Sequence, residues 1–284
     1  MSTTPYLTNI NGLSGYYLFN THQLSYDECI SLPSVRVHNP IELKQTIIYK
    51  YIPLKYLLVL LKEERLILNR VSSWEDPYEN FFLKQRFVKP GDLKSSYFTS
   101  VEDQTKGLYG MSWTLQDESD SLWRIYSPDK LSVRISCSVE RLIETVSSED
   151  NQWGVWVDKV HYMSERNMNS WLKDCKSVAS FDQFIEKMSE SFFIKRKAFK
   201  AEKEFRVIVN FFKKDTSSFV CFRCDPRSLI DSYFTDPRLN KYESKAVRTA
   251  LIDCGVDENK IQASNLYRFK PRKVEMTYDP FQDW

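Results

Sequence analysis

The sequence predicts an α+β fold, and two observations lead to this class. Stretches with strand-like alternation and stretches with helical spacing are interleaved along 284 residues, yet few of them form strict strand–helix–strand units. Glycine is scarce: the chain has seven, with no G-x-G-x-x-G motif and none placed before Lys-Ser/Thr. The pattern therefore excludes a classical dinucleotide fold, a P-loop NTPase and a protein kinase.

The first half of the chain alternates between expected strands and helices. Residues 45–52 are rich in β-branched and aromatic residues and predict a strand, which Pro53 ends. Pro53 then opens a leucine-rich helix over residues 54–64. The other elements expected in this half are a strand at 66–70, a loop at 72–79, a strand at 108–115, a helix at 121–126, a strand at 131–137 and a helix at 139–146.

The second half continues in the same way. Its expected elements are a strand at 153–162, a helical segment at 167–195, strands in the second half of 195–210 and at 219–223, a helix at 241–253 that ends before Gly255, and a last strand at 261–267. We expect three parts: an extension packed on the core (1–45), a single α+β domain (46–267) and a basic C-terminal tail (268–284).

The composition is ordinary for a soluble protein, with 42% hydrophobic and 27% charged residues and a net charge of +2. The N-terminus lacks the features of a signal peptide, and no apolar run approaches the roughly 20 residues of a membrane helix. We therefore expect a cytoplasmic protein without a membrane partner. Three scattered histidines and one lone Cys-x-x-Cys pair, Cys221 and Cys224, predict no metal site.

Three short motifs combine aromatic and polar residues. Residues 74–79 place three carboxylates, among them Asp76, beside Trp74 and Tyr78; this loop could bind a ribose or a metal, or simply be a turn. In residues 111–114, Ser112 and Thr114 share one face of a strand. In residues 121–126, three side chains could stack on a base and hold a phosphate, or belong to a core helix: Trp123, Arg124 and Tyr126.

The tract 193–214 is the most unusual feature, because it carries eight bases and two acids in a chain whose total charge is only +2. Strand alternation would place Glu202, Glu204 and Arg206 on one face. Such paired carboxylates suit acid–base chemistry, although a solvated strand with ion pairs is an equal alternative. With the basic stretch 268–273, the tract makes nucleic acid a plausible partner.

These motifs resemble the bacterial family called domain of unknown function 2971. The resemblance extends over roughly residues 47–265, with Glu75 where the family usually has Asn. It is carried by Tyr49-Lys-Tyr51, the Leu57–Leu61 helix, Glu75-Asp-Pro-Tyr-Glu79, Ser112, Leu122-Trp-Arg-Ile-Tyr126, Lys195-Arg196 and Glu202-Lys-Glu-Phe-Arg206.

The order of elements is also similar, more weakly, to ADP-ribosyltransferase-like domains, which implies a split mixed or antiparallel sheet flanked by helices. By this analogy Glu204 or Glu202 would orient the ribose of NAD and stabilise an oxocarbenium-like transition state, with Ser112 as a third catalytic residue. The expected nucleotide-binding residues are Lys50, Tyr51, Asp76, Thr114, Trp123, Arg124, Tyr126, Lys195, Arg196 and Arg206. The Arg or His that such domains carry on the first strand is absent here.

The resemblance implies NAD-dependent ADP-ribosyl transfer or NAD glycohydrolysis, in a defence or toxin context and without a metal. Two other functions remain open at this point. The chain could be a non-catalytic module that binds nucleotides or nucleic acid, or a metal-dependent nuclease that uses the carboxylates of both motifs.

Overall fold

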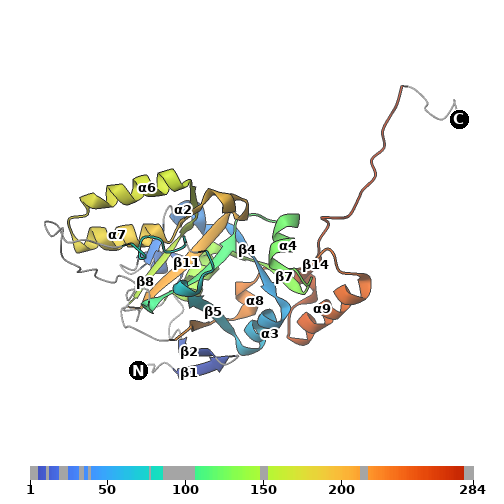
Figure 1. The fold of residues 1–284 in the computed structure, drawn as a ribbon. Coiled ribbons are helices and arrows are strands. Elements are labelled where there is room, and N and C mark those ends of the chain that lie inside the picture. Colours follow the sequence, from blue (N-terminus) through green and yellow to red (C-terminus); the bar gives the residue numbers. More distant parts are fainter. Residues whose placement is uncertain are drawn as a thin grey trace.

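The fold was obtained as a computed structural model, which describes residues 6–10, 13–18, 25–31, 35–37, 40–76, 78–85, 106–147, 153–211 and 217–277. Within these residues, twelve strands form one mixed sheet and two more pair separately, with helices on both sides (Figure 1). The expected α+β class is therefore confirmed. No helix in the described segments has the length and apolar character that crossing a bilayer requires.

The main sheet has a linear path and one branch. Most neighbours are antiparallel, but the pairs β2–β12, β3–β8 and β13–β14 are parallel, so the sheet is mixed. The path runs through β1 (Tyr6–Ile10), β2 (Leu13–Leu18), β12 (Phe219–Arg223), β5 (Arg65–Arg70), β6 (Leu108–Thr114), β4 (Ile47–Pro53), β7 (Ser132–Ser138), β13 (Ser232–Thr235) and β14 (Ile261–Ala263), and the branch through β11 (Glu204–Phe211), β8 (Trp153–Lys159) and β3 (Val35–Val37).

The sheet splits at β6. One edge of this strand pairs with β11 over its whole length, from Leu108 to Thr114. On the other edge, β5 pairs only with Tyr109 and Gly110, while β4 pairs only with Thr114. Strands β4 and β5 therefore diverge beside the middle of β6 and leave the backbone there without a strand partner on that edge.

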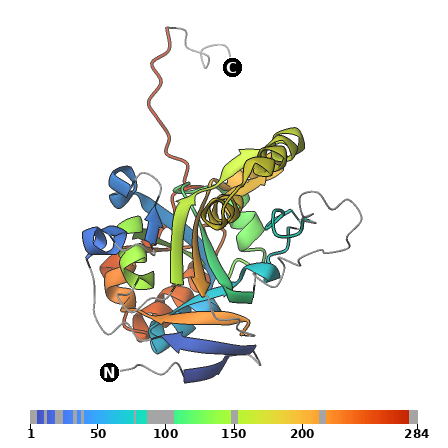
Figure 2. The same ribbon diagram turned by 90° about the vertical axis from the view of Figure 1, so that its left-hand side faces the viewer.

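Helices cover both faces of the sheet. Figure 2 shows α6 and α7 on one side of β8 and β11, whereas α1, α2 and α5 lie on the other. The helices are α1 (Tyr26–Ser31), α2 (Pro40–Lys44), α3 (Leu54–Glu63), α4 (Asp120–Tyr126), α5 (Val139–Val146), α6 (Glu165–Asp174), α7 (Phe181–Ser191), α8 (Pro226–Leu229) and α9 (Lys241–Asp253), with short 3₁₀ turns η1 (Val71–Ser73), η3 (Cys175–Ser177), η4 (Lys197–Glu202) and η5 (Glu258–Lys260).

The core has a large part and a small part, one on each face of β11. Phe205, Val207 and Val209 point into the larger core, which α3, α5 and α9 cover. Ile208 points the other way, into a smaller core that includes Phe192 and Phe193. This is the two-residue period of a strand buried on both faces, and each such side chain contributes about 1.5–3 kcal/mol by its burial.

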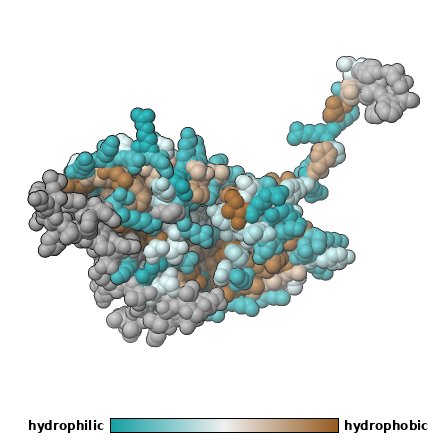
Figure 3. Space-filling model, in the orientation of Figure 1, coloured by the Kyte–Doolittle hydropathy of each residue, from teal (hydrophilic) through white to brown (hydrophobic). Residues whose placement is uncertain are grey.

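The C-terminal residues leave the body of the molecule. After a turn at residues 265–268, where Tyr267 bonds to Asp120, residues 269–277 run outward as an extended segment that carries both hydrophilic and hydrophobic side chains (Figures 1 and 3). Phe269 and Val274 on this segment are exposed. At the other end, β2 pairs with β12 and β3 with β8, so strands from the first 45 residues join the sheet.

Most of the expected elements occur with shifts of one or two residues at their ends. The expected strand at 153–162 is two strands, β8 and β9 (His161–Met163), and β9 pairs with β10 (Ile194–Arg196) outside the main sheet. The expected helical segment at 167–195 is two helices, α6 and α7. The last strand ends at Ala263 rather than 267, and β13 was not expected at all.

Candidate functional site

Three carboxylates and two cations meet where β11 begins, and all of them are buried except Glu202, which is partly exposed. We call this group the carboxylate cluster; it consists of Glu79, Lys195, Glu202, Glu204 and Arg206. The Lys195 Nζ lies 2.5 Å from Glu204 Oε1, 2.7 Å from Glu202 Oε2 and 3.5 Å from Glu79 Oε1. The Arg206 Nε donates to Glu204 Oε2 at 2.6 Å, and its Nη2 donates to Glu79 Oε1 at 2.5 Å.

Arg206 is the most deeply buried member, with 1% of its side chain exposed. Its remaining donor, Nη1, bonds to the Phe192 carbonyl at 2.7 Å, and its guanidinium lies 4.5 Å from the Trp74 ring centroid. Glu79 enters the cluster from the loop after η1, and Lys195 enters it from β10. Because removing one partner strands a buried charge, breaking such a network costs about 3–5 kcal/mol.

A left-handed residue brings Glu202 into the cluster. Strand alternation predicted that Glu202 and Glu204 lie on one strand face, but β11 begins only at Glu204, and Glu202 ends the turn η4. Lys203 between them has φ 44°, a conformation unusual for a residue other than glycine. The turn is held by Thr114, whose hydroxyl donates to the Glu202 carbonyl at 2.6 Å. The two carboxylates converge through this turn and not through strand periodicity.

The two carboxylates of the pair differ in pKa. Burial alone would raise the pKa of Glu204, but the Arg206 guanidinium, with Lys195, holds it well below its ordinary value. Burial raises the pKa of Glu202 to about 7, and the hydrogen bond with the Glu204 carboxylate acts in the same direction. The two cations balance two of the three carboxylates, so one site is left to hold a proton. A permanent anion thus lies beside a group that exchanges a proton near neutral pH, as acid–base chemistry requires.

Ser112 and Lys50 lie at the sheet split. The register pairs Ser112 with Arg206 and Thr114 with Glu204, so these four side chains share one face. The Ser112 hydroxyl donates to Glu204 Oε2 at 3.2 Å.

Lys50 fills the gap left by the diverging strands. Its Nζ donates to the Ser112 carbonyl at 2.8 Å, where β4 no longer pairs with β6. Burial lowers the pKa of Lys50 to about 8, while the nearby Glu204 carboxylate opposes this shift. The structure therefore brings Lys50 to the same group as Ser112 and Glu204.

Helix α4 contributes one residue to the site rather than three. Tyr126 is 40% exposed. Partial burial raises the pKa of its hydroxyl group, and the negative charges of Glu202 and Glu204 act in the same direction. Tyr51 lies behind it, with ring centroids 6.1 Å apart and the rings nearly parallel.

The other two residues of this motif do not form the predicted base-stacking platform. Trp123 is fully buried, packs edge-to-face on Tyr51 at 4.7 Å and donates its Nε1–H to Glu118. Arg124 is exposed and pairs with Asp120 one turn earlier, at 2.9 Å. Full burial contradicts the stacking role expected of Trp123, whereas the phosphate contact expected of Arg124 stays a prediction.

Asp76 and Arg196 pair with each other. The Arg196 Nη2 donates to Asp76 Oδ1 at 2.8 Å, and its guanidinium lies 4.4 Å from the Tyr78 ring centroid. Arg196 follows Lys195 on β10, and Asp76 precedes Glu79 in the same loop, so this pair adjoins the carboxylate cluster.

The basic tract 193–214 does not form one continuous cationic surface. Lys195 and Arg206 are buried among carboxylates, and Arg196 pairs with Asp76. Lys213 and Lys214 lie outside the described residues. Among the residues of the tract that the structure describes, the exposed cations are Lys197, Lys200 and Lys203.

Two residues of the site are not among those expected for NAD binding or catalysis. Glu79 is expected from the sequence only for the nuclease alternative, and it bridges Arg206 and Lys195. Tyr162 accepts a hydrogen bond from the Glu204 backbone N–H at 2.7 Å. Nothing in the sequence marks Tyr162, because its position depends on the separate pairing of β9 with β10.

The cations that face the carboxylates of the site are side chains of the chain itself. An ammonium lies between Glu79, Glu202 and Glu204, and Asp76 has its guanidinium. In the described segments, no three or more His, Cys, Asp or Glu residues are grouped so that they could hold a metal ion.

Comparisons with solved structures reveal distant similarity. The chain resembles Thermus sp. 2.9 DarT in complex with NAD⁺ at 11% identity, with a TM-score of 0.36, over 78% of this chain and 96% of that one. For the complex of the same protein with ADP-ribosylated ssDNA, the values are 12%, 0.33, 77% and 97%. Similarity at this level supports no inference about this chain. No curated protein matches the sequence.

A family comparison gives a direct sequence match. The pattern of the family described as "Protein of unknown function (DUF2971)" matches residues 122–207, which is less than the 47–265 expected from the motifs. The matched segment includes Tyr126 and four members of the carboxylate cluster, but not Lys50, Ser112 or Glu79. The resemblance to the DUF2971 proteins is therefore confirmed for residues 122–207.

Proposed function

We propose that the chain cleaves the nicotinamide–ribose bond of NAD and passes the ADP-ribosyl group to an acceptor or to water. The observation that carries this proposal is the pair of neighbouring carboxylates with opposite pKa shifts, Glu202 and Glu204, at the sheet split. The order of strands that carry Lys50, Ser112 and Glu204 agrees with the ADP-ribosyltransferase-like layout inferred from the sequence.

Each carboxylate has a separate role in this proposal. As the glycosidic C–N bond breaks, its electrons leave with the nicotinamide, which departs uncharged, and positive charge builds up on the ribose. The Glu204 carboxylate, kept ionised by Arg206, stabilises that charge. Glu202 then takes the proton of the attacking hydroxyl, because its pKa of about 7 allows both states near neutral pH.

Access to the site fits this division of roles. Glu204 is nearly buried, Glu202 has 12% of its side chain exposed, and Tyr126 is more open. We infer that the substrate ribose approaches from the side of Glu202 and Tyr126, and that Lys50, Tyr51 and Thr114 lie on the nucleotide side. Ser112 positions the Glu204 carboxylate through its hydrogen bond.

Nicotinamide release tests the proposal. Purified full-length protein is incubated with NAD, alone and with nucleic acid or a cell lysate, and compared with Glu204→Gln, Glu202→Gln and the remote control Glu63→Gln. Glu63 is half-exposed and pairs with Arg65 at the end of α3. We expect Glu204→Gln to lose at least about 100-fold in rate and the control to keep the wild-type rate.

A folding check accompanies this assay, since Glu204→Gln leaves two cations less well compensated. Glu202→Gln is the safer variant, because it removes a group that already carries a proton part of the time. Absence of release from folded wild-type protein under every condition would reject the proposal, as would equal rates in folded Glu204→Gln and wild type.

Exposed cations favour a second function, nucleic-acid binding. Lys197, Lys200 and Lys203 are exposed on the turn that carries Glu202. We expect affinity for single-stranded DNA or RNA to fall with salt, and replacing all three lysines with Gln to reduce the salt slope. If Glu204→Gln binds as the wild type does and neither protein releases nicotinamide, the chain is a binding module.

A further inference from the structure

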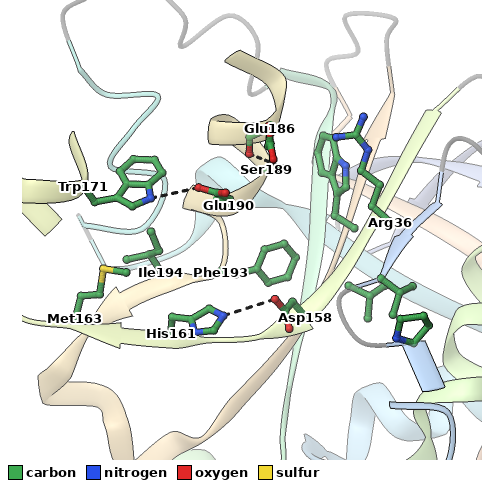
Figure 4. A pocket seen from close by; sticks show the side chains of 14 residues that line it. Arg36, Asp158, His161, Met163, Trp171, Glu186, Ser189, Glu190, Phe193 and Ile194 are labelled. Atoms are coloured by element: carbon green, nitrogen blue, oxygen red, sulfur yellow. Dashed lines mark hydrogen bonds and ion pairs between the residues drawn. The ribbon is translucent and has the colours of Figure 1, made fainter. Parts of the chain in front are cut away.

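A cavity of about 620 Å³ opens on the face of the molecule that α6 and α7 cover (Figure 4). Its walls come from β8, the β9–β10 pair, α6 and α7, with the segment around β3 on the far side. No member of the carboxylate cluster lines it, so the function proposed above leaves it without a role. Its volume falls in the range of small-molecule sites.

Aromatic rings line the cavity. They are Trp156 of β8, Trp171 of α6 and Phe193, which lies just before β10. Phe193 projects toward the space between Glu190, Asp158 and Arg36 (Figure 4). The face of an aromatic ring carries negative charge density and attracts cations as well as apolar groups.

Carboxylates outnumber cations on the same walls. Asp158, Glu186 and Glu190 line the cavity, against one arginine, Arg36, and one histidine, His161. The His161 Nε2 lies 3.6 Å from Asp158 Oδ2, so part of that carboxylate's charge is offset when the ring is protonated. Glu186 is exposed on α7 and its side chain makes no ion pair in the described residues. Lys187 pairs with Glu190, so the three carboxylates face two permanent cations, Arg36 and Lys187, which leaves an excess of one negative charge while the His161 ring is neutral. This excess favours a positively charged ligand.

Two lining residues of this cavity, Trp171 and Glu190, already hold an ammonium group of the protein itself. The Nζ of Lys187 lies 5.6 Å from the Trp171 ring centroid and 2.7 Å from Glu190 Oε2. The Trp171 Nε1–H also donates to this carboxylate, at 3.3 Å. A ring and a carboxylate are thus arranged here so that together they hold an ammonium.

The β9–β10 pair separates the cavity from the carboxylate cluster. Its register places His161 beside Ile194 and Tyr162 beside Lys195. His161 and Ile194 line the cavity, whereas Tyr162 and Lys195 contact Glu204. The cavity and the cluster therefore lie back to back on opposite faces of one two-stranded ribbon, which makes the cavity a separate site.

We propose that this cavity binds an organic cation, a protonated amine or guanidinium on an apolar body. The apolar body packs on Trp156 and Phe193, and the charged end lies near Asp158 and Glu186, since Lys187 already pairs with Glu190. This proposal does not depend on NAD chemistry, since neither the probe nor the readout below involves NAD.

Three probes of one shape test the charge requirement on the full-length protein: 2-phenylethylamine, 2-phenylethanol and 3-phenylpropanoate. Binding is followed by saturation-transfer NMR and titration. We expect the amine to bind at least about fivefold more tightly than the alcohol, and the carboxylate to bind most weakly. Equal affinities, a preference for the carboxylate, or no signal from any probe would overturn the proposal.

A pair of variants on α7 locates the binding site. Glu186→Gln removes a cavity carboxylate, while Asp182→Asn removes an exposed carboxylate on the same helix that does not line the cavity. We expect Glu186→Gln to weaken amine binding by about threefold to fivefold and Asp182→Asn to leave it unchanged. Equal effects of the two variants would show that the amine responds only to overall charge, which contradicts the assignment.

Discussion

Replacing Lys195 with methionine tests the carboxylate cluster most directly. The change keeps the length of the side chain but removes the ammonium that lies within 3.5 Å of three carboxylates. None of the four side chains is more than 12% exposed, so water cannot replace the lost charge. Arg206 then faces three carboxylates alone, and we expect a loss of about 3–5 kcal/mol in the free energy of unfolding.

Urea unfolding followed by tryptophan fluorescence measures this loss. With a slope of about 3 kcal/mol per M, the midpoint should fall by roughly 1–2 M at about pH 7. Lys197→Met is the matched control, because Lys197 is exposed two residues further along the chain. The control should stay within about 0.5 kcal/mol of the wild type.

The pH dependence of the stability of Lys195→Met provides a second test. Lys195 opposes the upward shift of the Glu202 pKa, so without Lys195 this pKa lies still further above its value in the unfolded chain, and protonation of Glu202 favours the folded state. The deficit of Lys195→Met should therefore be largest at about pH 7 and should shrink toward about pH 5. An unchanged midpoint at neutral pH, or a deficit that grows on acidification, would refute the electrostatic account of this cluster.

Three further predictions concern single residues. Since the pKa of Glu202 is raised to about 7, its contribution to the free energy of unfolding is present below about pH 4.3 and is lost as the pH rises through about 7. The urea midpoint of Glu202→Gln, relative to that of the wild type, should therefore rise from about pH 5 to pH 8. The opposite trend would contradict the raised pKa of Glu202. Trp123→Ala should lower the free energy of unfolding, measured by heat or urea, by about 3–5 kcal/mol because the ring is fully buried. A near-neutral effect would show that Trp123 is not a core residue and would favour its role in ligand stacking. Gly110→Ala should lower the free energy of unfolding in the same assay by about 1–3 kcal/mol, since the new Cβ would lie 2.7 Å from Trp74 Cζ2 and 2.8 Å from Ile208 Cδ1. Wild-type stability would show that these two side chains can move aside.

Several parts of the site could be predicted from the sequence because they depend on local pattern. The alternation in residues 108–115 predicted that Ser112 and Thr114 share a strand face, and both lie on the same face of the sheet as Glu204 of the neighbouring strand β11. The strand and helix after residue 45 are found within two residues of their expected limits. Strand and helix periods are properties of consecutive residues, so they can be inferred without knowledge of the tertiary fold.

Other inferences failed because burial and long-range pairing decided them. Trp123 and Arg124 have the composition of a stacking platform, but which side of α4 faces the core is set by Tyr51 on a distant strand. The charge of the tract 193–214 suggested a cationic surface, yet Lys195 and Arg206 are neutralised partly by Glu79, more than 100 residues earlier. Net charge along a sequence does not indicate where the counter-charges lie.

The sequence by itself determined the α+β class, the limits of the main helices and strands, and the residue types that gather around Glu204. Only the tertiary structure decided that Glu79 and Tyr162 join them, that a left-handed Lys203 turns Glu202 toward Lys195, and that β4 and β5 diverge beside Ser112. The reason is physical. Periodicity is a local property of the chain, whereas the pKa values of Glu202 and Glu204 follow from burial and from charges that only the folded chain brings together.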